Sequence, residues 1–271
     1  MDENTKIVQA HYDTNVLGEW NRIAGRPEFL LTCRMLDRYI KPGDKVLDIG
    51  GGPGRYSFYL AEKGCDITLF DLSPENVKFV GEKSVELNLP VKTICGDARE
   101  AGKLVSATEQ FDHVLLMGPL YHLLEETDRI TAVNAALNLL KPNGIIFISF
   151  ISTFGGLIFG MKDCPDFVAW EIEKEFIEQV VSQKSLRGDK GNTFTRTYMI
   201  EKNEVLPFMA QFMLEKLHLF GQEGILSPCE NNIMSQPKEI VDLWLDLCEK
   251  LWEREDLLSW AEHLMYVGKK I

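Results

Sequence analysis

The sequence predicts a doubly wound α/β fold, in which helices cover both faces of a mostly parallel sheet. Short apolar segments alternate with amphipathic helices between residues 45 and 151, and this alternation is typical of βαβ units. A turn rich in glycine directly follows the first apolar segment. Gly, Asn and Pro separate the later segments and stop their helices. We therefore expect a single domain built around one such sheet.

Five strands and the turns between them can be assigned in this central region. The expected strands cover residues 45–49, 66–71, 91–95, 111–117 and 145–151. Ser73 and Pro74 supply an N-cap and a first-turn proline for the helix after the second strand. The Lys-Pro-Asn-Gly segment at residues 141–144 stops the helix before the fifth strand. Residues 45–151 are thus expected to form the core.

The N-terminal segment, residues 1–44, is expected to form a helical cap. Its pattern predicts two helices, and the second ends before Pro42 and Gly43. This second helix carries four apolar residues at helical spacing, which are Phe29, Cys33, Leu36 and Ile40.

Residues 152–192 interrupt the alternation and are expected to form a lid or substrate insertion. Residues 153–161 are apolar but contain three glycines, and these favour a mobile lid that excludes water. The alternative is a helix packed on the sheet or against a second copy of the chain. A charged amphipathic helix should follow, with Phe167, Trp170, Ile177 and Val181 as its apolar residues.

The C-terminal segment, residues 193–271, is expected to complete the sheet. The pattern predicts strands at residues 192–200, 215–220 and 263–267 and a helix at residues 204–212. A further helix after Ser235 carries Ile240, Trp244, Leu247 and Leu251 at helical spacing.

Composition argues against several kinds of partner. A net charge of −12 and an isoelectric point near 5.0 disfavour a nucleic-acid substrate, because phosphate backbones are bound by clustered Lys and Arg. The apolar runs are shorter than the roughly 20 residues of a membrane helix, and the N-terminus begins with acidic residues. We therefore expect a cytoplasmic protein, as a monomer or homodimer. The six cysteines are scattered, and no metal-ligand spacing is found, so no metal is expected.

The most informative segment is residues 46–54, where an apolar strand enters a turn with four glycines. Such a turn needs residues without a Cβ, so that a ligand can approach the backbone. The dinucleotide-binding frame would require a third glycine where Arg55 stands. Acidic residues follow the next two strands, at Asp71 and Asp97. Because these strand ends meet at one edge of a parallel sheet, we expect a single ligand-binding crevice there.

The Asp-x-Gly-x-Gly-x-Gly frame at residues 48–54 resembles motif I of the class I methyltransferases that depend on S-adenosylmethionine (AdoMet). Residues 139–147, a helix end, turn and strand, are similar to the segment that completes the same half of that fold. The resemblance covers residues 45–151. It implies a Rossmann-like, seven-stranded sheet, mostly parallel with an antiparallel last strand, and a lid insertion after the fifth strand.

The resemblance also implies roles around the first two strands. The loop formed by Gly50, Gly51 and Gly52 would pass beside the methionine portion of AdoMet, and Asp48 would orient that portion. Asp71 would hold the ribose, because a carboxylate can accept hydrogen bonds from both hydroxyls.

Further cofactor contacts follow from the same resemblance. Leu72 would pack on the adenine, and Asp97 and Ala98 would contact its amino group and ring. Met117 ends the fourth strand, in a segment that resembles the motif facing both cofactor and substrate. Tyr12 in the N-terminal cap would reach the cofactor carboxylate.

Tyr121 and His122 are the candidate catalytic residues, since they follow the fourth strand at the crevice. A histidine with an ordinary pKa of roughly 6.5 could remove a substrate proton during methyl transfer. His122 could instead be a structural hydrogen-bonding residue that opens the next helix.

The resemblance implies methyl transfer from AdoMet to a small molecule by in-line displacement. The acceptor atom, which could be O, N, S or C, stays open, as does the need for a base. Three alternatives compete: an RNA-modifying methyltransferase, a non-catalytic AdoMet-binding regulator and a nicotinamide oxidoreductase. The glycine frame disfavours the last.

Overall fold

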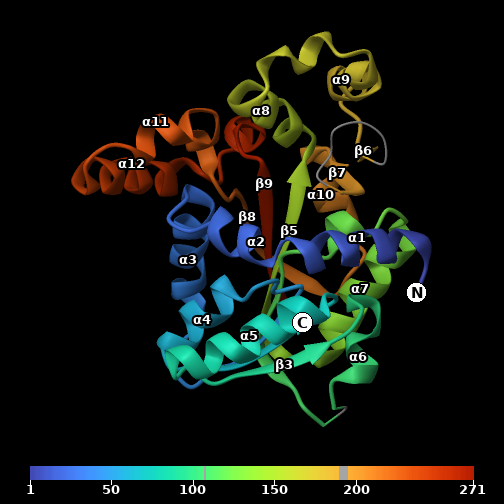
Figure 1. Cartoon of the computed structure of the whole chain (residues 1–271), viewed down its shortest axis with the longest axis vertical. Coiled ribbons are helices and arrows are strands. Elements are labelled where there is room, and N and C mark those ends of the chain that lie inside the picture. Colours follow the sequence, from blue (N-terminus) through green and yellow to red (C-terminus); the bar gives the residue numbers. More distant parts are fainter. Residues whose placement is uncertain (107, 189–194) are drawn as a thin grey trace.

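The computed structural model describes residues 1–106, 108–188 and 195–271, and within these residues one sheet contains nine strands (Figure 1). The strand order β3-β2-β1-β4-β5 continues across β5 into β9 and then β8. The bounds are β1 (Lys45–Ile49), β2 (Asp66–Asp71), β3 (Val91–Cys95), β4 (Phe111–Leu116), β5 (Leu140–Ser152), β6 (Leu186–Gly188), β7 (Thr197–Ile200), β8 (Leu214–Gly221) and β9 (His263–Lys270).

The predicted doubly wound arrangement is confirmed. The strands β1 to β5 pair in parallel, whereas β9 is antiparallel to both β5 and β8. The count of seven that the resemblance implies is two short, because β6 and β7 add a small hairpin, and β7 falls within the strand predicted at residues 192–200. Strand β7 joins β5 through the pairs of Ile151 with Met199 and Ser152 with Ile200, and β6 pairs antiparallel to β7. Residues 192–194 of the predicted strand lie outside the described part of the chain.

Strand β5 begins earlier than predicted, at Leu140. Phe111 of β4 pairs with Leu140, and the next pair joins His113 with Ile145, so residues 141–144 bulge out of the ladder. Asn143 has a φ of 62°, which Asn tolerates better than most residues. The predicted helix stop is correct, and the chain rejoins the same strand after it.

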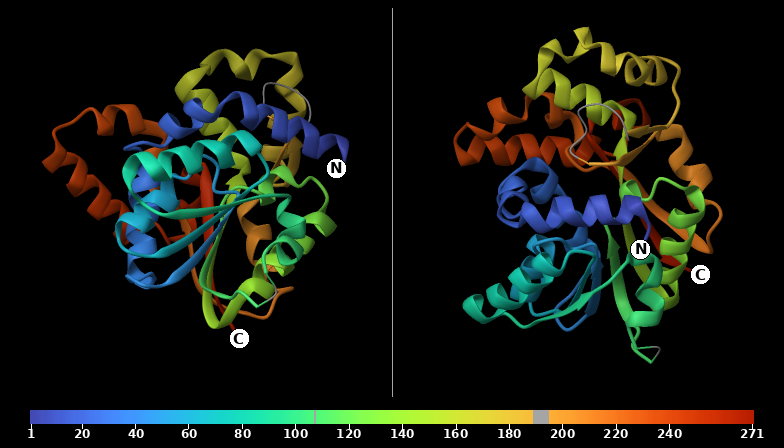
Figure 2. Two further views of the ribbon diagram at one scale, coloured as in Figure 1. Left: turned by 60° about the horizontal axis from the view of Figure 1, so that its bottom comes forward. Right: turned by 45° about the vertical axis from the view of Figure 1, so that its right-hand side comes forward.

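Helices cover the two faces of the sheet in separate layers (Figure 2). The apolar residues of α3, α4, α5 and α12 form one core, and those of α6, α7 and α10 form the other. The bounds are α1 (Glu3–Thr14), α2 (Val16–Arg22), α3 (Pro27–Tyr39), α4 (Arg55–Glu62), α5 (Pro74–Leu87), α6 (Ala101–Leu104), α7 (Glu126–Leu139), α8 (Thr153–Asp163), α9 (Lys174–Val181), α10 (Lys202–Met209), α11 (Glu230–Met234) and α12 (Lys238–Leu251). None of the described helices is both long and apolar enough to cross a bilayer.

The N-terminal cap contains three helices, whereas the sequence predicts two. The predicted first helix breaks at Asn15, which ends α1 with a φ of −125° and begins α2. Helix α1 crosses in front of β5 near its middle in Figure 1. The cap therefore supplies residues to the edge of the sheet where the parallel strands end.

The insertion begins with a regular helix, α8, and its glycines lie against neighbouring chain. A Cβ on Gly155 would come within 2.9 Å of the backbone oxygen of Glu262, and a Cβ on Gly160 would overlap the Phe167 ring. The glycines thus serve close packing, as the packed-helix alternative expects. The predicted second helix of the insertion is interrupted by 3₁₀ turns at Pro165–Ala169 and Glu171–Glu173, so α9 begins only at Lys174.

Helix α12 buries a different face from the one predicted. Its buried residues are Val241, Leu245 and Cys248. Ile240 and Leu247 are each 42% exposed, and Trp244 is 37% exposed. The predicted helix is present, but two apolar stripes run along it, and spacing alone does not show which one faces the sheet.

Candidate active site

The glycine turn after β1 brings bare backbone to the carboxyl edge of the sheet. Gly50 has a φ of 74°, and a Cβ there would lie 2.5 Å from Cδ of Pro119. A Cβ on Gly51 would lie 2.7 Å from Cδ1 of Leu69. A Cβ on Gly52 would meet nothing within 4 Å. The first two glycines are therefore required by close packing, whereas the third leaves the backbone open.

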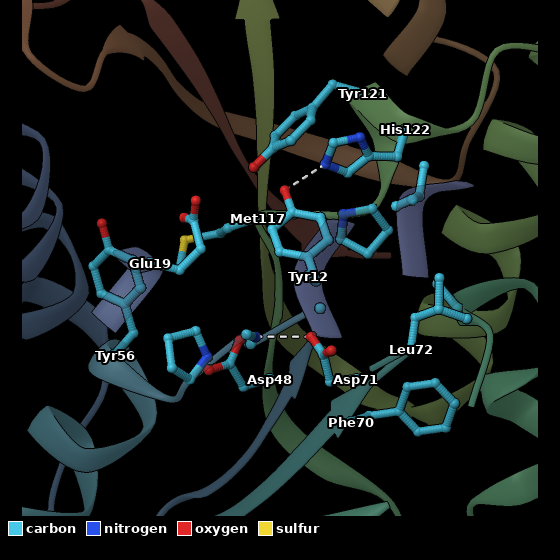
Figure 3. Close-up of a pocket in the computed structure, with 18 of the residues that line it drawn as sticks. Tyr12, Glu19, Asp48, Tyr56, Phe70, Asp71, Leu72, Met117, Tyr121 and His122 are labelled. Carbon is cyan, nitrogen blue, oxygen red and sulfur yellow. Dashed lines mark hydrogen bonds between the residues drawn. The ribbon is translucent and has the colours of Figure 1, made fainter. Parts of the chain in front are cut away.

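A narrow cavity of about 150 Å³ lies above this turn (Figure 3). Every residue predicted to contact a cofactor or take part in catalysis lines it. These residues are Tyr12, Asp48, Gly50, Gly51, Gly52, Asp71, Leu72, Asp97, Ala98, Met117, Tyr121 and His122. The four strand ends and the N-terminal cap thus meet at one place, and Asp71 and Asp97 lie on the same cavity.

Asp71 is buried at the end of β2 and fastens the glycine turn to the start of α5. Its Oδ2 accepts a hydrogen bond of 2.8 Å from the backbone N–H of Gly52, which Figure 3 shows as a dashed line. Its Oδ1 accepts from the backbone of Ser73 at 2.9 Å and from Nδ2 of Asn76 at 3.1 Å. Burial raises the pKa of Asp71, while these three donors oppose the increase.

Asp48 is also buried, with one hydrogen bond of 2.7 Å from the Ser57 hydroxyl to its Oδ2. Burial raises its pKa to about 7, and the nearby Asp71 adds to the increase. A carboxyl group poised in this way becomes fully ionised when a cation lies beside it. The site therefore favours a ligand with a positive group near the glycine turn.

Asp97 is held by Arg99, which the sequence did not single out. Nε and Nη2 of Arg99 donate to the two Asp97 oxygens at 3.0 and 2.6 Å. Arg99 also donates to Asp128 at 2.8 Å, to Asp2 at 2.9 Å and to the Thr5 hydroxyl at 2.8 Å. One guanidinium thus joins the end of β3 to α7 and to the start of α1.

His122 lies between α1 and β7 in the described structure. Its Nε2 is 2.7 Å from the Tyr12 hydroxyl, and its Nδ1 is 3.2 Å from the backbone oxygen of Arg196. Burial lowers its pKa to about 4, so the ring is neutral at pH 7. Tyr121 packs edge-on against the His122 ring at 4.8 Å.

A second cavity of about 500 Å³ adjoins the first. Four residues line both cavities, namely Tyr12, Glu19, Arg22 and Tyr121. The second cavity extends under α8 and α9 and is lined there by aromatic side chains. His122 lines only the first cavity, whereas Tyr121 stands at the boundary.

Sequence reasoning missed a set of charged residues at this boundary. Arg22 donates to Glu19 at 2.9 Å and to Glu28 at 3.2 Å, and all three side chains line the first cavity. They come from α2 and α3, where charges at helical spacing resemble an ordinary exposed face. The number of charged residues in this short cap could have indicated that some of them face a site, because the cap is expected to pack on the core.

Three residues of the described part could hold a metal ion. Glu28, Glu223 and His263 each offer one ligand atom, and these atoms lie within 4.8 Å of one another. The three belong to α3, the segment after β8 and the start of β9, so no local spacing could reveal them. In the structure, Glu223 and His263 are joined by hydrogen bonds, and the charge of Glu28 acts on His263.

Comparison with known proteins agrees with this geometry. The sequence profile of the family described as methyltransferase domain matches residues 46–144. A ubiquinone biosynthesis O-methyltransferase of Xanthomonas campestris pv. campestris is 36% identical over 118 residues, which are 42% of this chain and 46% of that protein. A protein of the same name from Xanthomonas oryzae pv. oryzae is 30% identical over 169 residues, which are 56% of this chain and 67% of that protein. The chain thus spans about half the length of the first of these relatives.

A solved structure extends the likeness to the whole fold. The 1,6-didemethyltoxoflavin-N1-methyltransferase of Burkholderia thailandensis, bound to 1,6-didemethyltoxoflavin and S-adenosylhomocysteine (AdoHcy), has a TM-score of 0.60 and 14% identity. The alignment covers 98% of this chain and 88% of that one.

The strand order and the cavity at the carboxyl edge define a doubly wound α/β protein with a site for a nucleoside-like ligand. Together with the matches, they identify the group. The chain belongs to the class I AdoMet-dependent methyltransferases.

Proposed function

We propose that the protein transfers a methyl group from AdoMet to an oxygen of a small molecule. The observation that carries this proposal is that the two cavities share Tyr12, Glu19, Arg22 and Tyr121. A donor in the first cavity and an acceptor in the second would meet at this shared boundary. Oxygen is the acceptor atom in the names of the two Xanthomonas relatives.

The residues around the first cavity suit AdoMet. Asp71 would hold the ribose, with Leu72 beside the adenine, and Asp48 would lie near the cationic end of the cofactor. The buried Oδ1 of Asn4 lines this cavity and has no hydrogen-bond partner among the described residues, so it could accept from the adenine amino group. Asp97, held by Arg99, would also lie beside the adenine.

AdoMet, when bound, supplies a methyl carbon already activated by the sulfonium. The protein's contribution would then be positioning, since fixing donor and acceptor in line is worth roughly 7 to 11 kcal/mol. We propose that Tyr121 contacts the acceptor at the boundary. His122 would act as a positioning residue that orients Tyr12, because both its ring nitrogens have partners and the ring is neutral.

The competing functions are less well supported. A non-catalytic regulator would need no second cavity beside the cofactor, and an RNA methyltransferase would need a basic rim. The second cavity is instead lined by carboxylates as well as cations, including Glu19, Asp163, Glu173 and Glu262. The cytoplasmic location and the choice between monomer and homodimer stay predictions.

Calorimetric titration with AdoMet, AdoHcy and NADH tests the cofactor assignment. We expect AdoMet and AdoHcy to bind and NADH not to bind. Transfer of a labelled methyl group to small hydroxylated acceptors then tests the reaction. Preferred binding of NADH, or tight AdoMet binding with no transfer to any acceptor, would favour the oxidoreductase or the regulator.

A further inference from the structure

The second cavity has an aromatic wall. Four aromatic side chains of the insertion line it, which are Phe159, Phe167, Trp170 and Phe176, and Tyr121 lies at its boundary with the first cavity. Aromatic side chains favour offset or edge-on contacts with other rings, which add about 0.5 to 1.5 kcal/mol to the burial of apolar area. A volume of about 500 Å³ accommodates a drug-sized planar molecule. The wall therefore fits an acceptor with an aromatic ring.

A histidine that lines the same cavity is held in a fixed orientation. Nδ1 of His263 lies 2.6 Å from Oε1 of Glu223, and the backbone N–H of His263 donates to Oε2 at 3.0 Å. Glu223 is 3% exposed, so this pair is shielded from water. The Nε2 atom of His263 has no hydrogen-bond partner among the described residues, and the ring lines the second cavity.

The same histidine is close to the first cavity. A carboxylate oxygen of Glu28, which lines the first cavity, lies within 4.8 Å of a His263 ring nitrogen. The ring centre of His263 is also 6.3 Å from that of Tyr121, which lines both cavities. His263 therefore stands at the acceptor side of the boundary.

The charged groups around His263 are mostly paired with one another. Arg22 binds Glu28, and Lys162 of α8 binds Glu262 at 2.6 Å. Burial lowers the pKa of His263, but Glu223 and Glu28 outweigh this effect and, with Glu262, raise it to about 9. The ring is thus an imidazolium at neutral pH that is paired with Glu223, whereas Glu28 and Glu262 each also have a cationic partner.

We propose that the second cavity binds an aromatic acceptor with an ionisable hydroxyl, and that His263, oriented by Glu223, holds this hydroxyl as an oxyanion. This inference rests on the proposed function. His263 is then a catalytic residue, since its Nε2 contacts the reacting oxygen, and Glu223 is a positioning residue. Tyr121 and His122, the residues predicted from sequence, would not remove the proton.

The reaction balances with the groups present. The acceptor O–H bond breaks and its proton passes to water, because Nε2 of the His263 imidazolium already carries a proton, and the oxyanion accepts a hydrogen bond from that N–H. The oxygen then forms a bond to the methyl carbon, and the electron pair of the broken carbon–sulfur bond stays on sulfur. The products are the methyl ether, neutral AdoHcy and the proton released to water, and His263 stays protonated throughout. A hydroxyl with an ordinary pKa near 10, such as a phenol, is well matched to this imidazole.

A dye titration tests the proposal without turnover. The probe is 4-nitrocatechol, which is yellow when ionised, added to AdoHcy-loaded protein at a pH where the free dye is protonated. We expect the bound dye to be ionised. His263→Gln should abolish the ionisation of the bound dye and lower methyl transfer to the dye by about 10² to 10⁴-fold. The matched control is His218→Gln, because His218 is also paired with a glutamate, Glu253, but lines neither cavity.

Glu223→Gln supplies a second readout should His263→Gln fail to fold. Without the Glu223 charge, the pKa of His263 should fall toward its ordinary value of roughly 6.5, although Glu28 and Glu262 still raise it. Affinity for the ionised dye should therefore fall as the pH rises through about 9 in the unaltered protein and through a value about two pH units lower in the variant. An unchanged pH profile would overturn the positioning role.

Two further outcomes would overturn the proposal. The first is dye that binds in its protonated form, or does not bind at all, while AdoHcy binds normally. The second is ionisation that is abolished by EDTA and restored by Mg²⁺ or Zn²⁺, which would make Glu28, Glu223 and His263 a metal site. Failure of AdoHcy itself to bind would contradict the proposed function instead, so the two failures are distinguishable.

Discussion

The Tyr12 hydroxyl lies 2.7 Å from Nε2 of His122, and this contact joins the N-terminal helix to the segment after β4. Because burial lowers the pKa of His122 to about 4, the pair is a neutral hydrogen bond at pH 7. The nearby donation from Nδ2 of Asn4 to the backbone oxygen of His122, at 2.8 Å, fixes the same segment. The contact therefore controls how α1 sits on the cofactor cavity.

Replacing Tyr12 with Phe should weaken AdoHcy binding about tenfold, since Nε2 of His122 would lose the Tyr12 hydroxyl and α1 would be held less firmly. The free energy of unfolding should fall by about 1 to 3 kcal/mol, the cost of an unsatisfied buried polar atom. Calorimetry and urea unfolding measure the two effects. Tyr59→Phe is the matched control, because its hydroxyl bonds to Asp37 and it does not line the cavity. Equal AdoHcy affinities for both variants would contradict the role of the pair.

Replacing Asp71 with Asn should weaken AdoHcy binding about 10 to 100-fold while preserving the fold. The amide keeps an oxygen for the Gly52 N–H but loses the charge that strengthens hydrogen bonds to ribose. Asp71→Ala should in addition destabilise the protein, since three donors would lose their acceptor. Calorimetry combined with thermal unfolding separates the two variants. Unchanged affinity for Asp71→Asn would remove the ribose assignment.

Binding of AdoHcy should release protons from Asp48. Its pKa is about 7 in the free protein and should fall when the cofactor ammonium lies beside it. The complex then binds fewer protons than the free protein, so affinity should rise with pH below about 7 and level off above it. Calorimetry in buffers of different ionisation enthalpy measures the release near pH 7. Asp48→Asn should show neither the release nor the slope, and a slope that persists would assign it to another group.

Replacing Gly51 with Ala should destabilise the protein by about 1 to 3 kcal/mol. The new Cβ would lie 2.7 Å from Cδ1 of Leu69 and 2.8 Å from Oδ2 of Asp48, and both neighbours are buried. The control is Gly81→Ala in α5, where a Cβ meets nothing within 4 Å and should stabilise the helix by about 0.5 to 1 kcal/mol. Urea unfolding compares the two. Equal stability of both variants would contradict the tight turn.

The central sheet and the cofactor cavity could be predicted because local signals specify them. The first three strands have the predicted bounds, since each alternates with a helix whose caps are visible, such as Ser73 at α5. The glycine turn and the strand-end acids Asp71 and Asp97 follow from the rule that parallel strands end at one edge. These signals lie within a few residues of the features they predict.

The acceptor side could not be predicted, because it is assembled from distant segments. Glu28, Glu223 and His263 are separated by 195 and 40 residues in the chain. The position of His263 depends on the antiparallel insertion of β9 beside β5, and that of Glu223 on the turn after β8. In the sequence, the glycines of α8 favour a mobile lid over a packed helix. In the fold they leave room for Glu262 and Phe167, contacts that only the tertiary structure reveals.

The hydrogen bonds of Arg99 also affect how the protein would exchange AdoHcy for AdoMet. Through Asp2 and Thr5, this one guanidinium fastens the first turn of α1 over a cavity of about 150 Å³, smaller than the roughly 300 Å³ of the smallest common ligand sites. We therefore expect the N-terminal helix to shift when AdoMet enters or AdoHcy leaves. An acceptor in the second cavity, beside α8 and α9, would enter and leave without this movement of α1. A higher ionic strength weakens the ion pair between Arg99 and Asp2. It would therefore change the rates at which the cofactor binds and dissociates, and leave those of the acceptor largely unchanged.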